Sequence, residues 1–528
     1  MNTRRKRVPA RCAALAALLA LTACGGSGDD APPLSQRCGT WVGKSLGDGS
    51  ATVTAAGLQA GAPANGATTQ ALPEYCKVDV AARDTGLKVG LWLPTEGWNG
   101  KLLMQGGGGF DGAIAAPTPS LLLANMSPSV VGERYAVMAT NGGHEPAENA
   151  NGAFALDAVK LTEFAQTSEH RALPWGKELV IAGYGRAPER SYFEGCSMGG
   201  HDAMMLSQRY SADFDGIVAR APAGNIMGLF PVFSRLSITV RNPSNRLTPA
   251  KQTLLASAVL AQCDSLDGLA DGIISRPAAC TPDLSALRCA GGADAGDACL
   301  SDAQLATVNL VTSPYASADG AYTHPGYNHG LEDSPVGWGQ YIWPIAAGQS
   351  VQGAFADGFV RGFITRNPSY DTNLWNPNDW LGRMAEVATL FQAFDPDLSG
   401  LRARNAKLIL WNGTNDTSVS SRDMGRYYRM AVARMGQAAA DQTLEAFEAP
   451  GVGHCGGGPG ADHVDLVKSL DTWVSAGTPP SAQSLVQARK SATGSVVLTR
   501  PLCKYPATPR YKGTGDADSA SSFACVSD

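Results

Sequence analysis

Short apolar runs separated by Gly-rich turns recur through residues 86–225, which is the pattern of buried β-strands. Helical patterns at 155–170 and 198–210 lie between these runs. Strands that alternate with helices predict a parallel sheet of the α/β class. The runs that we interpret as strands are 101–104, 135–138, 179–181 and 217–219, together with the β-prone segment 191–193.

The same alternation resumes in the C-terminal part of the chain. Two more strands and an amphipathic helix are expected at 407–411, 444–447 and 463–476. Residues 226–400 differ, because they are rich in Trp, Phe, Asn, Asp, Pro and Gly and show little strand periodicity. We therefore expect one α/β core, formed by 38–225 and 401–528, with 226–400 inserted into it as a second domain.

The first 23 residues have the pattern of an export signal. A basic stretch at 4–11 precedes an apolar run at 13–21 that is too short to span a bilayer. The segment Leu21-Thr22-Ala23-Cys24 resembles the bacterial lipoprotein signal, in which cleavage leaves Cys24 as the lipidated N-terminus. The alternative is an ordinary signal peptide that is cut elsewhere. Residues 24–37 read as a flexible tether. We expect an exported protein, either lipid-anchored to the outer membrane or periplasmic or secreted.

The composition indicates a large folded protein. Of its 528 residues 44% are hydrophobic and 17% are charged, which excludes general disorder. The net charge of -5 gives no electrostatic attraction to nucleic acid or to an anionic membrane. No other segment approaches the length of a transmembrane helix, so the lipid at Cys24 is the only membrane contact that we expect.

Twelve cysteines occur, of which Cys12 lies in the signal and Cys24 is the lipidation site. The remaining ten favour five disulfides, because an even number in an exported protein usually pairs. Their spacing does not suggest zinc. Proximity along the chain suggests Cys38–Cys76, Cys263–Cys280, Cys289–Cys299 and Cys503–Cys525, which leaves Cys196 to pair with Cys455.

The segment Gly195-Cys196-Ser197-Met198-Gly199 has the form G-x-S-x-G. It follows the β-prone 191–193 and precedes the helical pattern at 198–210, which is the strand-turn-helix context that lifts a nucleophilic serine above a sheet. In a Gly-rich chain the motif also arises as a simple turn. The context favours Ser197 as a nucleophile.

A serine hydroxyl needs an imidazole to take its proton and a carboxylate to orient that imidazole. Asp416 follows the strand 407–411, and His454 follows the strand 444–447. The order Ser197, Asp416, His454 is that of the α/β-hydrolase fold. Asp423 competes with Asp416, but it lies inside a helical pattern. A disulfide between Cys196 and Cys455 would hold the serine and histidine loops together, because bonded cysteines have Cα atoms within about 4.4–6.8 Å.

An oxyanion hole requires two backbone N–H groups near the reacting carbonyl. The residue after the nucleophile, Met198, is expected to supply one. The run Gly106–Gly109 follows the strand 101–104, where this fold places the second donor. We assign it to Gly108, with Gly109 as the alternative.

Three carboxylates occur within eight residues of the inserted domain, at Asp264, Asp267 and Asp271. With the carbonyl oxygens of Leu269 and Ile273 they would supply hard oxygen ligands of the kind that Ca²⁺ prefers. The alternative is an acidic, solvated turn. We expect a structural calcium ion here, and no catalytic role for it.

These features resemble the tannase and feruloyl esterase family. The resemblance covers about 38–528 and is carried by the segments 191–197 (SYFEGCS), 213–216 (DFDG), 221–223 (APA), 453–458 (GHCGGG), 500–503 (RPLC) and 510–513 (RYKG). It implies an α/β-hydrolase core under a lid domain and serine esterase chemistry on aromatic acid esters. It also implies the triad Ser197, Asp416 and His454, the linking disulfide Cys196–Cys455 and a structural Ca²⁺ in the acidic loop.

We therefore expect a serine carboxylesterase that acts on small aromatic esters of the feruloyl, galloyl or mono(2-hydroxyethyl) terephthalate type. The rival hypothesis is a non-catalytic surface protein that binds aromatic or polysaccharide ligands on the same fold. Aromatic lid residues that would contact a substrate are Trp338, Tyr341, Trp343, Phe355, Phe359, Trp375 and Trp380, and arginines that would hold an acid group are Arg361, Arg366 and Arg383.

Overall fold

The computed structural model describes residues 32–63, 71–114, 131–344 and 349–527. The expected signal peptide and Cys24 lie outside the described residues. Within the described part, no helix combines the length and the apolar character needed to cross a membrane.

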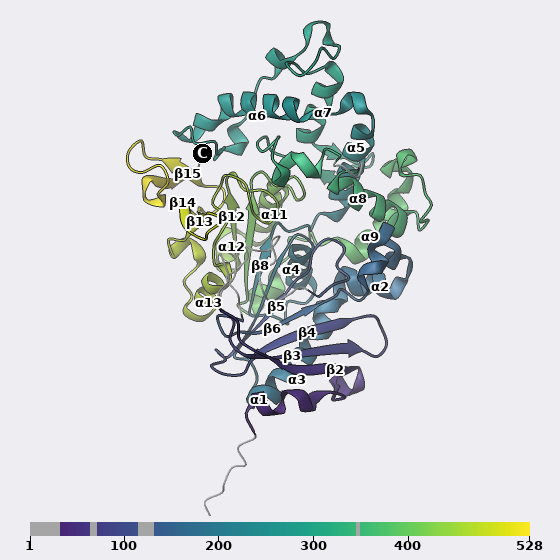
Figure 1. The fold of residues 1–528 in the computed structure, drawn as a ribbon, viewed down its shortest axis with the longest axis vertical. Helices are drawn as coiled ribbons and strands as arrows, with labels where there is room; N and C mark the ends of the chain where they lie inside the picture. Colours follow the sequence, from purple (N-terminus) through teal and green to yellow (C-terminus); the bar gives the residue numbers. More distant parts are fainter. Residues whose placement is uncertain (1–31, 64–70, 115–130, 345–348, 528) are drawn as a thin grey trace, which may run out of the picture.

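A ten-stranded mixed sheet forms the centre of the molecule, in the order β1-β2-β3-β4-β6-β5-β7-β8-β11-β12 (Figure 1). The first four strands and the β4–β6 pair are antiparallel, and the strands from β6 to β12 are parallel. The α/β class expected from the sequence is confirmed. The strands are β1 Ser45–Leu46, β2 Ala51–Gln59, β3 Tyr75–Ala82, β4 Lys88–Pro94, β5 Lys101–Gln105, β6 Ala136–Thr140, β7 Arg190–Cys196, β8 Gly216–Arg220, β11 Lys407–Gly413 and β12 Leu444–Ala449.

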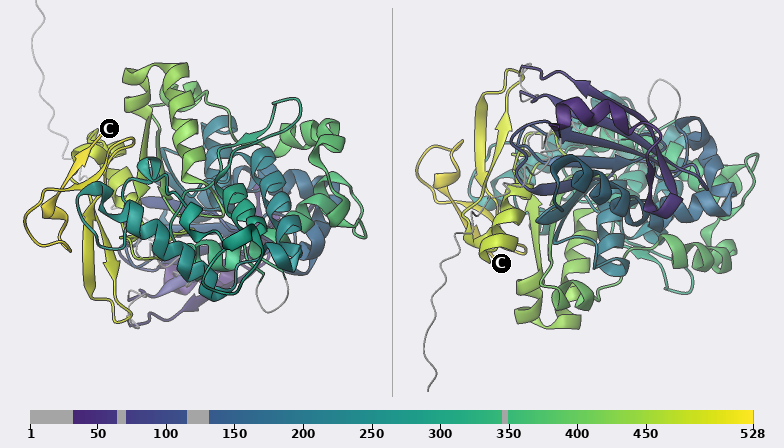
Figure 2. Two further views of the ribbon diagram at one scale, coloured as in Figure 1. Left: turned by 90° about the horizontal axis from the view of Figure 1, so that it is seen from above. Right: turned by 90° about the horizontal axis from the view of Figure 1, so that it is seen from below.

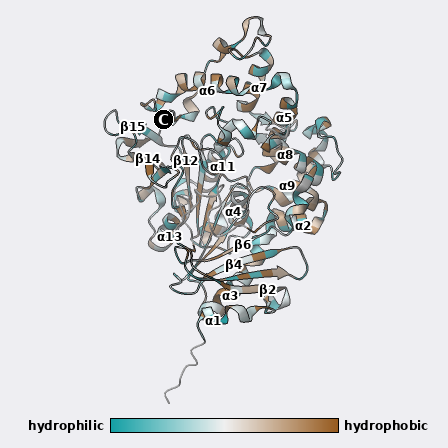
Figure 3. Ribbon diagram, in the orientation of Figure 1, coloured by the Kyte–Doolittle hydropathy of each residue, from teal (hydrophilic) through white to brown (hydrophobic). Residues whose placement is uncertain are grey.

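Helices cover both faces of the parallel strands, because successive strand residues point to opposite sides. In β11, Leu408 and Leu410 belong to the apolar cluster that also contains residues of α3, α4 and α11, whereas Ile409 and Trp411 belong to the cluster that contains residues of α13. Apolar residues accordingly run along the central strands (brown in Figure 3). The helices of the core are α1 Leu34–Arg37, α2 Ala158–Thr162, α3 Ser168–Tyr184, α4 Met198–Arg209, α11 Ser421–Met435, α12 Gln437–Thr443 and α13 Leu466–Ala476.

One expected strand is wrong. Residues 179–181 belong to the helix α3. Its buried positions Ala172, Trp175, Leu179 and Gly183 recur at helical spacing, and the helix ends at Gly185 in the left-handed conformation. An apolar run of three residues does not distinguish a strand from one face of a buried helix.

The chain between β8 and β11 forms a predominantly helical insertion, seen in teal and green above and beside the sheet in Figure 1. We call residues 226–400 the lid. Its only strands within the described residues are the two-residue β9 and β10. Its elements are α5 Ile226–Arg241, α6 Pro249–Cys263, α7 Asp302–Thr312, β9 Tyr315–Ala316, β10 Thr323–His324, α8 Val351–Gly358 and α9 Leu381–Phe391, and α10 Ser399–Ala403 leads back into the core.

After α13 the chain forms two small antiparallel pairs at one side of the molecule (yellow in Figure 2). In the second of these pairs, the disulfide Cys503–Cys525 closes the C-terminal segment. An ion pair between Arg500 and Asp271, with atoms 2.5 Å apart, joins this segment to the lid. The strands are β13 Val486–Lys490, β14 Val496–Pro501, β15 Thr508–Tyr511 and β16 Phe523–Val526.

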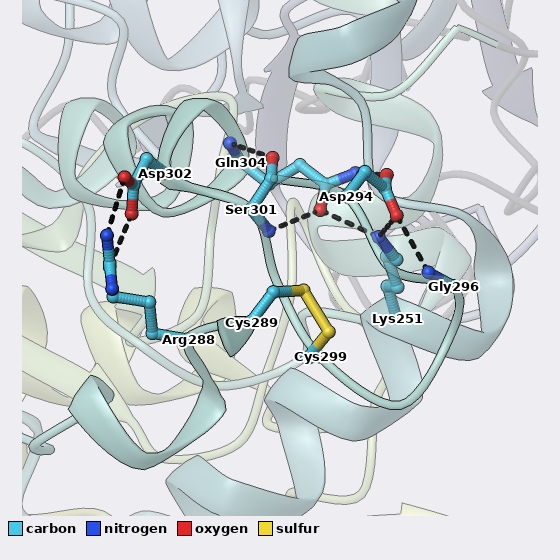
Figure 4. Close-up of a disulfide and its surroundings, with 9 residues drawn as sticks. All are labelled: Lys251, Arg288, Cys289, Asp294, Gly296, Cys299, Ser301, Asp302 and Gln304. Atoms are coloured by element: carbon cyan, nitrogen blue, oxygen red, sulfur yellow. Dashed lines mark hydrogen bonds and ion pairs between the residues drawn. A yellow bond between two sulfur atoms is a disulfide. The ribbon is translucent and has the colours of Figure 1, made fainter. Parts of the chain in front are cut away.

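The structure contains the five disulfides expected from the sequence. Two of them close short loops within the lid, Cys263–Cys280 and Cys289–Cys299. Figure 4 shows the second, flanked by the ion pairs Arg288–Asp302 and Lys251–Asp294. These disulfides stabilise a lid segment that has little regular structure, because they restrict its unfolded conformations. The others are Cys38–Cys76, Cys196–Cys455 and Cys503–Cys525.

Candidate active site

Ser197 occupies the turn between β7, which ends at Cys196, and α4, which begins at Met198. Its φ of 64° and ψ of -115° are sterically strained for a residue with a side chain. The turn is so tight that a Cβ on Gly195 would lie 2.3 Å from the carbonyl oxygen of Gly199. The strand-turn-helix context expected for the G-x-S-x-G segment is therefore present.

The structure brings Ser197, His454 and Asp416 together, although they lie on three separate loops. The His454 Nε2 atom is 2.8 Å from the Ser197 Oγ atom, and its Nδ1 atom is 2.8 Å from Asp416 Oδ2. The other Asp416 oxygen accepts hydrogen bonds from the backbone N–H groups of Ser418 and Val419. These bonds fix the carboxylate, which in turn orients the imidazole toward the serine hydroxyl.

Asp423, the alternative to Asp416, lies elsewhere. Its carboxylate accepts a hydrogen bond from Asn225 at 2.9 Å and pairs with Arg426 at 2.7 Å. Burial raises the pKa of Asp423 to about 6. Its partners make it a structural residue at the start of α11.

Each of the other six histidines has a partner away from the triad. His324, for example, is fully buried, and burial lowers its pKa to about 3. The hydrogen-bond partners are Asn149 for His144, Asp213 for His170, the Phe391 carbonyl for His201, the Gly326 N–H for His324, Glu332 for His329 and Asp462 for His463.

The disulfide Cys196–Cys455 joins the residues next to the serine and the histidine. Its two Cα atoms are 6.0 Å apart across a sequence separation of 259 residues. Cys455 has a φ of 60°, which is uncommon for a residue with a side chain. The bond therefore connects the turn after β7 to the loop after β12.

The two residues assigned to the oxyanion hole lie on adjoining segments. Met198 is the first residue of α4, where backbone N–H groups have no partner within the helix and attract negative charge. The Gly106–Gly109 loop is held against this helix by a hydrogen bond from the Gly199 N–H to the Gly107 carbonyl, 3.1 Å long. Burial raises the pKa of Asp111, whose carboxyl group lies beside this loop, and the Gly108 N–H opposes that shift in part.

A buried group of carboxyl side chains supports this loop, and the sequence pattern did not reveal it. Asp111 packs against Gly107, and Glu169 accepts hydrogen bonds from Thr140 and Ser168. Burial raises the pKa values of Asp111, Glu169 and Asp202, and the negative charge of Glu169 raises those of Asp111 and Asp202 further. Carboxyl groups so placed favour their neutral forms.

Of the lid aromatics expected at the site, two lie near the triad loops. The Tyr341 ring centroid is 5.7 Å from that of His454, and the Phe355 ring packs against Gly109. Trp338, Trp343 and Phe359 are buried in the lid core, Trp380 contacts Tyr370, and Trp375 lines a separate cavity.

The three lid arginines named from the sequence all have partners away from the triad. Arg361 donates to Asn151, Arg366 to the Leu156 carbonyl, and Arg383 pairs with Glu386. These contacts do not point any of the three toward Ser197.

The acidic loop of the lid offers one unpartnered carboxylate oxygen, Asp267 Oδ2, which is buried. Asp264 accepts hydrogen bonds from the backbone N–H groups of Asp271 and Gly272, and Asp271 pairs with Arg500. Within the described residues, no three acidic, histidine or cysteine side chains are grouped as a metal site. Asp267 is thus the carboxylate of this loop that keeps an oxygen without a protein partner.

Comparison with known proteins agrees with this geometry. The family model for tannase and feruloyl esterase matches residues 75–526. Mono(2-hydroxyethyl) terephthalate hydrolase from Piscinibacter sakaiensis is 32% identical over 88% of this chain and 87% of its own. Feruloyl esterase B from Aspergillus niger is 28% identical over 87% of this chain and 88% of its own.

Solved structures agree with these relatives. Feruloyl esterase B from Aspergillus oryzae superposes with a TM-score of 0.80 at 26% identity, covering 93% of this chain and all of that one. The tannin acyl hydrolase from Aspergillus niger, 19% identical, shares the fold with a TM-score of 0.73 over 94% of this chain and 96% of its own. The chain therefore belongs to the tannase and feruloyl esterase family of carboxylic ester hydrolases.

Proposed function

We propose that Ser197, His454 and Asp416 hydrolyse the ester bond of an aromatic carboxylic acid through a covalent acyl-enzyme. The observation that carries this proposal is the continuous hydrogen-bonded chain from Ser197 Oγ through His454 to Asp416, with both contacts at 2.8 Å. A serine so placed loses its proton to the imidazole as it attacks the ester carbonyl.

In the first half-reaction, Ser197 Oγ bonds to the carbonyl carbon and its proton passes to His454 Nε2. The imidazolium formed is stabilised by Asp416 and then protonates the departing alcohol. In the second half-reaction, His454 takes a proton from water as the water oxygen attacks the acyl carbon. The imidazolium then returns that proton to Ser197 Oγ as the bond between Oγ and the acyl carbon breaks, which releases the acid and restores Ser197. The Met198 N–H, at the start of α4, is placed to stabilise the oxyanion in both halves.

The second oxyanion donor comes from the Gly106–Gly109 loop. We assign it to Gly108, as the sequence suggested, in which case its N–H turns from Asp111 toward the substrate oxygen. Gly109 is the alternative, and its neighbour Phe355 would then lie beside the bound acyl group.

The substrate class is proposed from the relatives. One relative is named for mono(2-hydroxyethyl) terephthalate and another for feruloyl esters. The acid part of both esters is aromatic. Tyr341, beside His454, and Phe355, beside Gly109, offer aromatic surfaces for such a ring.

We also propose that the lid loop binds Ca²⁺ in a structural role. Asp267 supplies the unpartnered oxygen, and the carbonyl groups of Leu269 and Ile273 supply others. Asp264 and Asp271 complete the shell when they exchange their present hydrogen-bond and ion-pair partners for the ion. Positive φ angles at Gly268 and Gly272 give the tight winding that brings such carbonyls together.

We also propose that the protein is exported and anchored to a membrane by a lipid. Five disulfides support an oxidising compartment outside the cytoplasm. The lipid anchor rests on the segment that ends at Cys24.

Turnover of p-nitrophenyl acetate tests the catalytic assignment. Ser197→Ala and His454→Ala should each lower kcat by about a thousandfold or more while leaving the circular dichroism spectrum unchanged. His170→Ala, at a half-exposed histidine away from the triad, should keep wild-type kcat. Either triad variant with a tenth of wild-type kcat would contradict the assignment. A wild type with no turnover would favour a binding protein.

A substrate panel then separates the ester classes. The values of kcat/KM for methyl ferulate, methyl gallate and mono(2-hydroxyethyl) terephthalate would be compared on the wild type and on Phe355→Ala. The preferred aromatic ester should lose the most efficiency in that variant, and p-nitrophenyl acetate the least, because its acetyl group has no ring to contact Phe355.

A further inference from the structure

A second cavity lies in the lid, and no residue of the triad lines it. Its volume is about 340 Å³, within the range of small-molecule sites. One wall is a single face of α5, where Pro231, Ser234, Arg235 and Ile238 recur at helical spacing. Phe230, on a neighbouring face of the same helix, packs against Phe110, the residue that follows the Gly106–Gly109 loop.

Arg235 is a charged group without a compensating anion in this wall. Within the described residues its contacts are a long hydrogen bond to the Leu310 carbonyl, 3.4 Å, and the face of the Tyr315 ring, 5.5 Å away. Its Nε atom is buried and has no hydrogen-bond partner. Burial lowers the pKa of the guanidinium, as expected for a cation that lacks a nearby carboxylate.

Two further donors, on cavity-lining residues outside α5, also lack acceptors. The hydroxyl group of Tyr315 and the indole N–H of Trp375 are buried without a hydrogen-bond partner. Buried donors normally find partners, and each one left unpaired costs about 1–3 kcal/mol. Arg235, Tyr315 and Trp375 all line the cavity, so three donors without protein acceptors belong to residues at its boundary.

The rest of the lining combines apolar side chains with the polar side chains of Ser234, Thr239, Asn376 and Asn378. Pro231 and Ile238 come from α5, and Pro377 and Trp375 come from the segment that precedes α9. Such a surface suits a hydrophobic body and not a fully hydrated ion. The ligand must therefore combine an anionic or strongly accepting head with a flat apolar body.

We propose that this cavity binds a small aromatic carboxylate, with its carboxylate at Arg235 and its ring against the apolar wall. The Tyr315 hydroxyl and the Trp375 indole then have a carboxylate oxygen to donate to after small side-chain rotations. This site is separate from the proposed esterase chemistry and does not use Ser197. It would let the lid sense an aromatic acid independently of turnover.

Isothermal titration calorimetry with benzoate tests the proposal on the full mature chain. The wild type should bind it saturably, Arg235→Gln about tenfold more weakly and Tyr315→Phe about threefold more weakly. Arg190→Gln, at an exposed arginine outside the cavity, should bind like the wild type. Benzamide, the neutral isostere, should bind the wild type at least about tenfold more weakly than benzoate does.

Crystals soaked in 4-bromobenzoate locate the ligand, because the bromine gives an anomalous peak. The peak is expected in the cavity beside Arg235. Its absence there, equal benzoate affinity of Arg235→Gln and wild type, or equal affinity for benzamide and benzoate would each overturn the proposal. If Arg235→Gln does not fold, Tyr315→Phe and the benzamide comparison decide it. Turnover of p-nitrophenyl acetate is measured separately, so failure here leaves the triad assignment untouched.

Discussion

At the residue scale, several acidic side chains lie in surroundings that disfavour their charged forms. Glu448, in β12, is the plainest case: burial raises its pKa to about 7, although Arg422 and Arg429 act in the other direction. An acid whose pKa is higher in the folded state than in the unfolded state binds more protons when folded. Its contribution to stability therefore falls as pH rises from about 4.5 to about 7.

We predict that Glu448→Gln has a higher free energy of unfolding than the wild type at pH 8, and that the gain disappears near pH 4. The physical reason is that glutamine has no charge to bury. Burial lowers the pKa values of His201 and His324 to about 4 and about 3, and this makes stability rise with pH. The contribution is the same in the wild type and in Glu448→Gln, so it does not change the difference between them. Urea unfolding across this pH range measures the difference.

Glu386→Gln serves as the control for this experiment, because Glu386 is an exposed partner of Arg383. Its stability should follow that of the wild type at every pH. A gain for Glu448→Gln that is the same at pH 4 and pH 8 would show that the change does not act through titration.

At the element scale, catalysis depends on loops that follow three different strands. The turn after β7 carries Ser197, the loop after β11 carries Asp416, and the loop after β12 carries His454. Because parallel strands end at one edge of the sheet, their following loops meet there. The disulfide Cys196–Cys455 adds a covalent link between two of these loops.

Replacing both Cys196 and Cys455 by Ala should lower stability and activity together. The chain-entropy model gives about 5 kcal/mol for so long a loop, as an upper value. A displacement of about 1 Å between Ser197 and His454 costs on the order of a hundredfold in rate. We expect kcat to fall at temperatures where circular dichroism shows the double variant still folded.

The matched control is the pair Cys503→Ala and Cys525→Ala, in the C-terminal segment. It should lower the melting temperature and leave kcat nearly unchanged. Wild-type kcat in the Cys196/Cys455 double variant would show that the hydrogen bonds of the triad hold the two loops together without the disulfide.

At the scale of the whole molecule, the lid and the C-terminal segment meet at the acidic loop, where Asp271 pairs with Arg500. An ion bound beside this contact would stabilise the folded state, because a ligand that binds only the native protein shifts the equilibrium toward it. Chelation with EDTA should therefore lower the wild-type melting temperature.

Asp267→Ala should have a lower melting temperature and no response to added Ca²⁺, whereas Asp319→Ala, at an exposed lid aspartate, should respond like the wild type. Differential scanning calorimetry with and without EDTA makes the comparison. A wild-type melting temperature that chelation leaves unchanged would remove calcium from the lid.

Membrane anchoring is also a property of the whole molecule. Cys24→Ser should move the protein from the membrane fraction to the soluble exported fraction, because the lipid on Cys24 is the anchor that we propose. Immunoblots of separated fractions measure this, with Cys12→Ser as the control within the signal. Unchanged membrane partitioning of Cys24→Ser would mean that the signal is cut elsewhere.

Much of the candidate site was predictable because its signals are local. A serine between small residues after a strand, and a histidine beside a cysteine after another strand, are recognisable within a few positions of Ser197 and His454. Four disulfides join cysteines that lie close along the chain, so proximity was enough to pair them. Helical and strand periodicity reports only local burial, and this is why 179–181 was misassigned.

The sequence by itself therefore determined the α/β core, the insertion, the disulfide pairs and the set of residues from which a triad could form. Only the tertiary structure decided that Asp416 and not Asp423 contacts His454, and that Tyr341 and Phe355 are the lid aromatics beside the triad loops. Likewise, only the tertiary structure placed the carboxyl group of Asp111 beside the Gly106–Gly109 loop. These contacts join residues from separate elements, and their distances follow from how helices pack on the sheet, which no local pattern of residues encodes.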